Sequence, residues 1–313
     1  MLIESPHSVG AALRHSPIVP VPPQGRTAAP FRLYQGLDRD SLSVQPDTAT
    51  FWLQARGSSF FSNREGYFVL RPGQWLALEH DCTASIDTEQ GAVLIGVGIR
   101  SSTLRDIHAH RNPWLPGEGC VDEDQCNALI DLWNQCAASA GGDHDEATRA
   151  LRCLLQGVRD AQHTLSQWVL RCPGRRSSRQ HQVFARLQRV RLYLRGHMGR
   201  MVPMEELARL TSCSPWWLSR IFKRVYGQTL QEYGLTQRIE YACWLLTQTE
   251  LAIAEISHDC GFDSPSSFAH RFRQHMGTTA GEYRSRQSDN RTQVSEHGRT
   301  TKSVAHHISL SGL

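Results

Sequence analysis

The sequence lacks the features of a membrane or secreted protein. No apolar run reaches the roughly 20 residues of a membrane-spanning helix, and Pro17, Pro20 and Pro22 stand where a secretory leader would be continuously apolar. The nine cysteines are irregularly spaced and none forms a CxxC pair, which argues against a disulfide framework or a zinc cluster. We therefore expect reduced cysteines, a cytoplasmic protein and no membrane contact.

The composition is that of an ordinary globular protein, but its charge is unevenly distributed. The 313 residues are 40% hydrophobic and 20% charged, enough for two domains with apolar cores. Residues 1–171 carry 14 Arg and 19 Asp or Glu, whereas residues 172–287 carry 17 Lys or Arg and 9 Asp or Glu. A basic block beside an acidic one is typical of a polyanion-binding module joined to another domain. A solvated basic face fits the charge alone equally well.

Pattern and composition divide the chain into five segments. We expect a mobile, proline-rich arm over residues 1–30, a sensor and dimerisation domain over 31–171, and an exposed linker over 172–182. Apolar positions from 183 to 287 follow helical spacing throughout, and residues 288–313 are polar, as in a disordered tail. The predicted fold class is α+β, with an N-terminal barrel or sandwich of strands and an all-α C-terminal domain.

The N-terminal segment leaves two alternatives open. Five aromatic residues either line a cavity for one small ligand or fill the core; they are Trp52, Phe60, Phe61, Tyr67 and Trp75. Two helices are expected after the strands, the first over Cys126–Ala137 and the second over Ala147–Val169. The apolar stripe from Leu151 to Val169 is either a dimer seam or part of the chain's own core.

Three histidines raise the question of a metal site. His108 and His110 have the spacing of paired ligands and His80 lies upstream, but no acidic ligand follows at a suitable distance. We therefore expect ordinary loop histidines, with no metal and no cofactor.

The C-terminal block contains two copies of one unit, offset by 50 residues. Each copy begins with serine and proline, at Ser214 and Ser264, the signature of a helix N-cap. Further matching pairs are Leu218 and Phe268, Phe222 and Phe272, Gly227 and Gly277, Thr229 and Thr279, Glu232 and Glu282, and Tyr233 and Tyr283. The glycines are placed to end helices and each Thr-x-x-Glu is a capping box. Each copy therefore predicts a helix-turn-helix unit.

The outward faces of the two capped helices carry polar and basic residues. In the first copy Trp216, Arg220 and Lys223 share a stripe, and the second copy has Ser266, His270 and Arg273 in its place. Such faces suit base edges and phosphates, although a merely solvated face is the common alternative. Two adjacent indoles, Trp216 and Trp217, argue against that alternative because both cannot face one apolar core.

Residues 183–287 resemble the DNA-binding domain of the AraC/XylS transcription regulators. The matching residues are Glu206-Leu207-Ala208, Ser214 to Lys223, Gly227, Tyr233, Arg238, Ala242, Leu245-Leu246, Ile256, Gly261-Phe262, Ser267-Phe268, Phe272-Arg273, Gly277 and Tyr283-Arg284. The resemblance implies two helix-turn-helix subdomains joined by a long helix, with recognition helices in successive major grooves. It gives as candidate base contacts Trp216, Trp217, Ser219, Arg220, Ser266, Ser267 and His270.

Five positions depart from the family's pattern. Pro203 and Ala252 stand where a Ser or Thr cap is expected, Ala280 replaces a proline, and Ser257 replaces an alanine. His270 stands where Arg or Lys is common, so the readout of the second helix is left open.

The resemblance also implies an N-terminal cupin-like barrel with dimerisation helices. The expected protein is then a homodimeric, effector-responsive regulator, an activator that binds double-stranded DNA and contacts RNA polymerase, and not an enzyme. One alternative is a DNA-binding module fused to an enzyme such as a cupin oxygenase or a repair alkyltransferase; Cys172-Pro173 does not supply the Pro-Cys-His-Arg order of the repair proteins. Another is a regulator controlled by a protein partner.

Overall fold

The computed structural model describes residues 31–44, 47–79, 82–100, 115–139 and 144–286. Within these ranges the chain forms two compact units. The first holds the strands and the helices up to Gly196 together with residues 204–227, and the second holds residues 197–203 and the chain from Gln228 onward. The predicted arm, the predicted tail and the three histidines lie outside the described residues.

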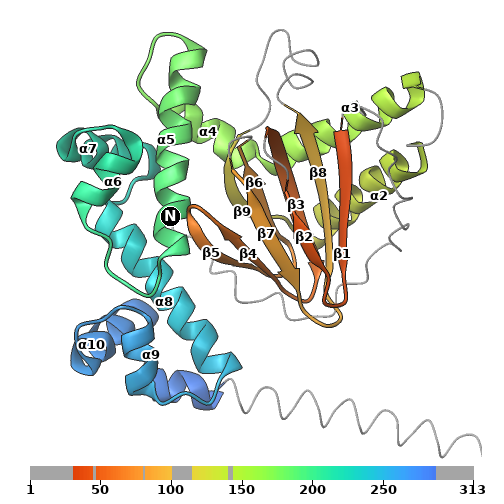
Figure 1. The fold of residues 1–313 in the computed structure, drawn as a ribbon. Coiled ribbons are helices and arrows are strands. Elements are labelled where there is room, and N and C mark those ends of the chain that lie inside the picture. The colour runs from red at the N-terminus through yellow and green to blue at the C-terminus, as the bar shows by residue number, and fades with distance from the viewer. Residues whose placement is uncertain (1–30, 45–46, 80–81, 101–114, 140–143, 287–313) are drawn as a thin grey trace, which may run out of the picture. The chain divides into compact units, whose positions relative to one another are not determined.

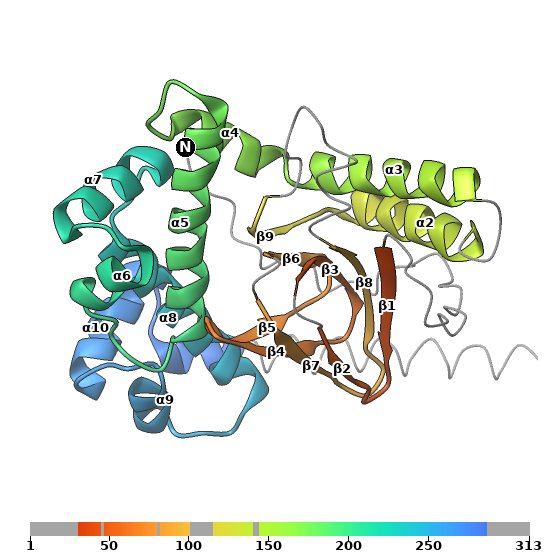
Figure 2. The ribbon, with the colours of Figure 1, turned by 45° about the horizontal axis from the view of Figure 1, so that its top comes forward.

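Nine strands occur among the described residues of the first unit and confirm a β-rich N-terminal region. They are β1 Phe31–Leu37, β2 Ser41–Ser43, β3 Thr48–Arg56, β4 Ser59–Asn63, β5 Gly66–Leu70, β6 Gln74–Leu78, β7 Ala84–Thr88, β8 Val93–Arg100 and β9 Gly117–Cys120. Five pair antiparallel in the order β1-β8-β3-β6-β9, and four in the order β2-β7-β4-β5 (Figures 1 and 2). Among the described strands no pairing joins the two sheets, so the expected barrel is not closed.

Large side chains from both sheets fill the space between them. Trp52 of β3 and Phe61 of β4 are fully buried, with ring centroids 5.7 Å apart in an edge-on arrangement. Gly96 of β8 leaves room for the indole, since a Cβ there would lie 2.5 Å from the Trp52 ring. Of the five aromatic residues that could line a cavity, Trp52, Phe61 and Trp75 are buried, whereas Phe60 and Tyr67 are exposed. Trp52 and Phe61 therefore belong to the core.

Three helices follow the strands in the first unit. They are α2 Glu123–Ser139, α3 His144–Ala161 and α4 His163–Arg171. The indole Nε1 of Trp133 in α2 donates to the Gly96 carbonyl at 2.9 Å, which holds α2 against β8. The stripe from Leu151 to Val169 is buried within the single chain, so the structure favours the core over a dimer seam at that stripe.

The long second helix that the periodicity predicts is interrupted at Gln162. The side chain of this buried residue accepts from the Leu115 amide at 3.3 Å and donates to the Leu115 carbonyl at 2.7 Å. Satisfying that distant backbone segment separates α3 from α4. Periodicity could not reveal the break, because the partner lies 47 residues away along the chain.

The remaining helices confirm an all-helical C-terminal region. They are α5 Ser177–Gly196, α6 Met204–Thr211, α7 Pro215–Tyr226, α8 Leu230–Gln248, α9 Ile253–Asp259 and α10 Pro265–Met276. Helix α5 begins inside the segment 172–182 predicted as a linker, so residues 172–176 alone separate it from α4. Helices α5 to α7 group with the strands, whereas the predicted boundary at residue 183 assigns them to the same domain as α8 to α10.

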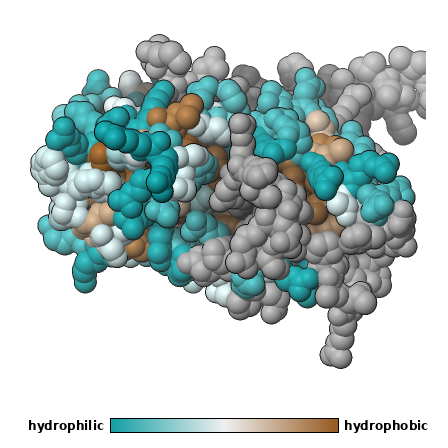
Figure 3. All heavy atoms as spheres, turned by 90° about the horizontal axis from the view of Figure 1, so that it is seen from above, coloured by the Kyte–Doolittle hydropathy of each residue, from teal (hydrophilic) through white to brown (hydrophobic). Residues whose placement is uncertain are grey.

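No described helix has the length and apolar character that crossing a membrane requires. On the face shown in Figure 3, hydrophilic residues cover most of the described surface and hydrophobic residues are scattered among them.

Candidate DNA interface

Helix α7 is held by the caps that the sequence predicts. The Ser214 hydroxyl accepts from the Trp217 amide at 3.3 Å, and Pro215 occupies the first helical position. At the other end Gly227 adopts a left-handed conformation (φ 77°) and donates its N–H to the Lys223 carbonyl at 2.8 Å. Both ends are thus hydrogen-bonded locally, and this fixes where α7 begins and ends.

The two faces of α7 differ sharply in character. Its inner face is buried and consists of Leu218, Ile221, Phe222 and Val225. On the outer face Trp216 is 68% exposed, and the Arg220 guanidinium lies over its ring at 5.1 Å from the centroid. An indole this exposed has no role in a single-chain core, and stacking on it orients the arginine.

Helix α10 repeats this construction in the second unit. The Ser264 hydroxyl accepts from the Ser267 amide at 3.2 Å, and Gly277 ends the helix with φ 72°. Phe268 and Phe272 are fully buried beneath it. Each helix therefore presents one polar face from a capped, anchored position.

All nine predicted DNA-binding residues lie at the surface of their own unit. Trp217 and Ser219 are half-buried. The other seven are exposed, namely Trp216, Arg220, Lys223, Ser266, Ser267, His270 and Arg273. Because α7 and α10 belong to different units, the structure brings these residues together within each helix only, and their contact with DNA stays a prediction.

The segments after α7 and α10 begin with the two predicted capping boxes. Thr229 donates its amide to the Glu232 carboxylate at 2.7 Å, and the Glu232 amide donates to the Thr229 hydroxyl at 3.2 Å. The same reciprocal pair joins Thr279 and Glu282. Hydrogen bonds from the Thr278 hydroxyl and from Thr279 lower the pKa of Glu282 to about 2.

Two departures from the family's pattern lie within the second unit. Ala252 has no side chain to cap α9, but its amide still donates to the Glu255 carboxylate at 2.7 Å, so half of a capping box remains. Ser257 is completely buried in the second unit.

The turns inside the helix pairs α6–α7 and α9–α10 share an unusual backbone conformation. Ser212 has φ 53° and Gly261 has φ 66°, and these two residues correspond under the 49-residue offset that relates Leu207 to Ile256. A Cβ at Gly261 would lie 2.5 Å from the backbone of Arg200, so glycine is required in the second turn.

Comparisons with known proteins match the C-terminal region. A model of a helix-turn-helix domain matches residues 207–286. The regulatory protein SoxS of Salmonella typhimurium is 33% identical over 90 residues, which are 29% of this chain and 84% of SoxS. The chain belongs to the AraC/XylS family of transcription regulators. It is therefore a DNA-binding transcription regulator.

Further relatives cover the same part of this AraC/XylS-family regulator. The HTH-type transcriptional activator AarP of Providencia stuartii is 29% identical over 109 residues, which are 34% of this chain and 81% of AarP. Among solved structures, the C-terminal domain of AraT, a response regulator from Geobacillus stearothermophilus, is 32% identical, with a TM-score of 0.31, over 32% of this chain and 83% of that one.

Sequence reasoning missed the support that α7 receives from α4. The Arg171 guanidinium donates to the Val225 carbonyl near the end of α7 at 3.2 Å. Trp168 packs edge-on against Tyr226 with ring centroids 5.1 Å apart, and Arg191 of α5 stacks on both rings. The DNA-reading candidate α7 is thus held by a helix that precedes the matched domain.

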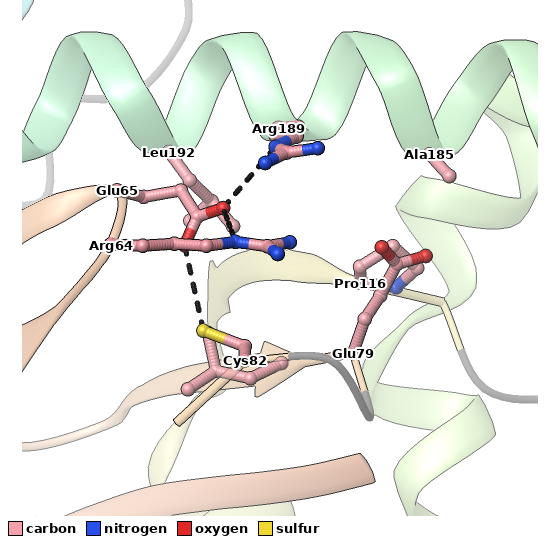
Figure 4. Close-up of a pocket in the computed structure, with 9 residues that line it drawn as sticks. Arg64, Glu65, Glu79, Cys82, Pro116, Ala185, Arg189 and Leu192 are labelled. Carbon is pink, nitrogen blue, oxygen red and sulfur yellow. Dashed lines mark hydrogen bonds and ion pairs between the residues drawn. The ribbon is translucent and has the colours of Figure 1, made fainter. Parts of the chain in front are cut away.

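Sequence reasoning also missed a buried carboxylate that joins α5 to the second sheet (Figure 4). Glu65, 3% exposed, receives the Arg64 Nε at 2.7 Å and the Arg189 Nε of α5 at 3.3 Å, and the Cys82 thiol donates to it at 3.5 Å. These residues line a small pocket, together with Leu78, Glu79, Pro116, Ala185 and Leu192. The sequence does not reveal the link to α5, since Arg189 lies far from Glu65 along the chain.

A second link joins α5 to the strands nearby. Arg195 forms an ion pair with Glu118 of β9, and its guanidinium donates to the Val69 carbonyl of β5 at 3.1 Å.

No cluster of three or more His, Cys, Asp or Glu that could hold a metal ion occurs among the described residues.

Proposed function

We propose that this regulator reads DNA with both helix pairs, α6–α7 and α9–α10, each acting as a helix-turn-helix unit. The observation that carries the proposal is the repeat itself: within residues 207–286, two capped helices with polar faces recur 50 residues apart and two matching turns recur 49 residues apart. In such an arrangement α7 and α10 enter major grooves, where Arg pairs with guanine and Ser side chains add further contacts.

We expect Arg220 and Lys223 to have different roles. Arg220 lies toward the N-terminal half of α7 beside Trp216, whereas Lys223 lies in its last turn. Arg220→Ala should therefore weaken binding to a selected target duplex by about 1–3 kcal/mol more than binding to random DNA. Lys223→Ala should weaken both similarly, as a phosphate contact would.

Competition titrations of the two variants against the unaltered chain measure this difference. Thr247→Ala, at a half-buried position on α8 away from both candidate faces, is the control for general effects of substitution. An equal loss on target and random DNA for Arg220→Ala would rule out base reading by Arg220.

The N-terminal sheets are proposed as a cupin-like sensor that responds to an effector and regulates activation. The support is the pair of facing sheets together with the partly buried Glu65–Arg189 and Arg195–Glu118 links to α5. A ligand shifts such an equilibrium only by binding one arrangement better than the other. Helix α5 contacts α6, and helix α4 contacts α7. An effector that displaces the sheet would therefore change the position of α7.

We expect the regulator to bind DNA as a homodimer and, like AarP, to activate transcription, doing so through RNA polymerase. A dimer occupies two half-sites and gains affinity through effective concentration. Since the stripe from Leu151 to Val169 is buried within one chain, the contact between protomers must use another surface. Sedimentation of the full chain should give a dimer mass on DNA; a monomer both free and bound would contradict the dimer.

A further inference from the structure

The segment around the α4–α5 turn is unusually rich in arginine. Between Asp160 and Glu205 the sequence contains nine arginines and no aspartate or glutamate. Several of these arginines bind within the chain, as Arg189 does with Glu65 and Arg195 with Glu118. We call three exposed residues the turn arginines: Arg175, Arg176 and Arg179. Their side chains form no ion pair or hydrogen bond with any residue that the structure describes.

The turn arginines lie at the N-terminal end of α5, where positive charge does not stabilise a helix. They lie just before or within the first turn of α5, where the helix dipole favours negative charge. The first turn of α5 contains no Asp or Glu that could neutralise them. Positive charges gathered at this helix start suit an anionic partner rather than the helix itself.

The α4–α5 turn begins beside the C-terminal end of α7. Arg171, immediately before the turn, donates to the Val225 carbonyl, and Gln180 donates to the Cys172 carbonyl at 3.3 Å, which ties the turn to α5. Arg224 lies in the last turn of α7 and directly precedes Val225, so it is close to the start of the turn.

The dimensions of α7 place that end near a DNA backbone. A helix of 12 residues is ~18 Å long, which exceeds the ~12 Å width of the major groove. If the N-terminal half of α7 reads bases, its C-terminal end reaches the edge of the groove, where phosphates line the strand. Arginines there neutralise phosphates without reading sequence.

We propose that the turn arginines, together with Arg224, form a second contact with the DNA backbone. The turn arginines lie outside residues 207–286, which the helix-turn-helix model matches, so this contact is contributed by the segment that leads from the N-terminal region. The proposal rests on the proposed function, in which α7 occupies a major groove, and extends the DNA footprint along the strand beside it.

The test compares two double variants of the full chain over a series of salt concentrations. In R175A/R176A, the slope of log affinity against log salt should become shallower by about 0.9 for each phosphate that the protein no longer neutralises. Affinity should fall by the same factor for a selected duplex and for random DNA. The control R149A/R152A removes two exposed arginines from α3, and R175K/R176K, which keeps the charge, should restore most of the slope.

Equal slopes for R175A/R176A and R149A/R152A would overturn the proposal. Failure of the proposed function would be seen in a different measurement. In that case Arg220→Ala would leave the discrimination between target and random DNA unchanged, whatever the salt slopes of the double variants are. A weakening confined to the selected duplex would also overturn the proposal, since phosphate contacts carry no sequence information.

Discussion

Phe272→Ala is expected to melt the α9–α10 pair and to abolish binding to the selected duplex. The Phe272 ring is fully buried and packs against Phe268 and Tyr283, with centroids 5.4 Å and 5.8 Å away. Emptying such a site costs about 3–5 kcal/mol, a large part of the stability of a small helical unit. Hydrogen exchange of the full chain should show reduced protection in α9 and α10, with the first unit unchanged.

The matched substitution Phe222→Ala should have the corresponding effect on α6 and α7, since Phe222 occupies the equivalent place in the repeat. Gln274→Ala, exposed on α10, is the control and should leave protection and binding as they are. If protection of α9 and α10 fell in Phe272→Ala while target binding persisted, the second pair would not be a DNA reader, and binding would rest on α7 alone.

Gly196→Ala is expected to detach the end of α5 from the β4–β5 hairpin. A Cβ at Gly196 would lie 2.2 Å from the Glu65 carbonyl oxygen and 2.9 Å from the Gly66 Cα. These are backbone atoms, which cannot move aside as a flexible side chain could. Overpacking typically costs about 1–3 kcal/mol, and we expect the upper end of that range because two backbones meet here. Thermal unfolding of the full chain measures the decrease in stability.

Gly281→Ala is the matched control for this substitution. Gly281 also lies in a helical segment, over residues 280–286 after α10, but a Cβ there would make only an ordinary contact with Ile253 at 3.8 Å. That variant should gain roughly 0.5–1 kcal/mol, because alanine loses less backbone entropy in a helix than glycine does. If Gly196→Ala were as stable as Gly281→Ala, the close approach of α5 and the hairpin would not be part of the folded state.

Local chemistry was sufficient to define the C-terminal helices in detail. Caps, capping boxes and glycine stops are local features, because each is satisfied by hydrogen bonds among residues three or four apart. Ser214, Thr229 and Gly277 therefore mark helix ends without knowledge of the rest of the fold. The repeat adds a second, independent copy of each signal, so the outward faces of α7 and α10 follow from the amino-acid sequence.

Long-range packing, in contrast, decided how the N-terminal region is built and where α5 belongs. Gln162 breaks a periodic helix to satisfy Leu115, and the buried Glu65 pairs with Arg189 of a distant helix in addition to its neighbour Arg64. Trp52 and Tyr67 look equally suited to a cavity in sequence, yet one is core and the other surface. These outcomes depend on partners far away along the chain, and the pairing of a buried polar or aromatic group is fixed by packing rather than by local pattern.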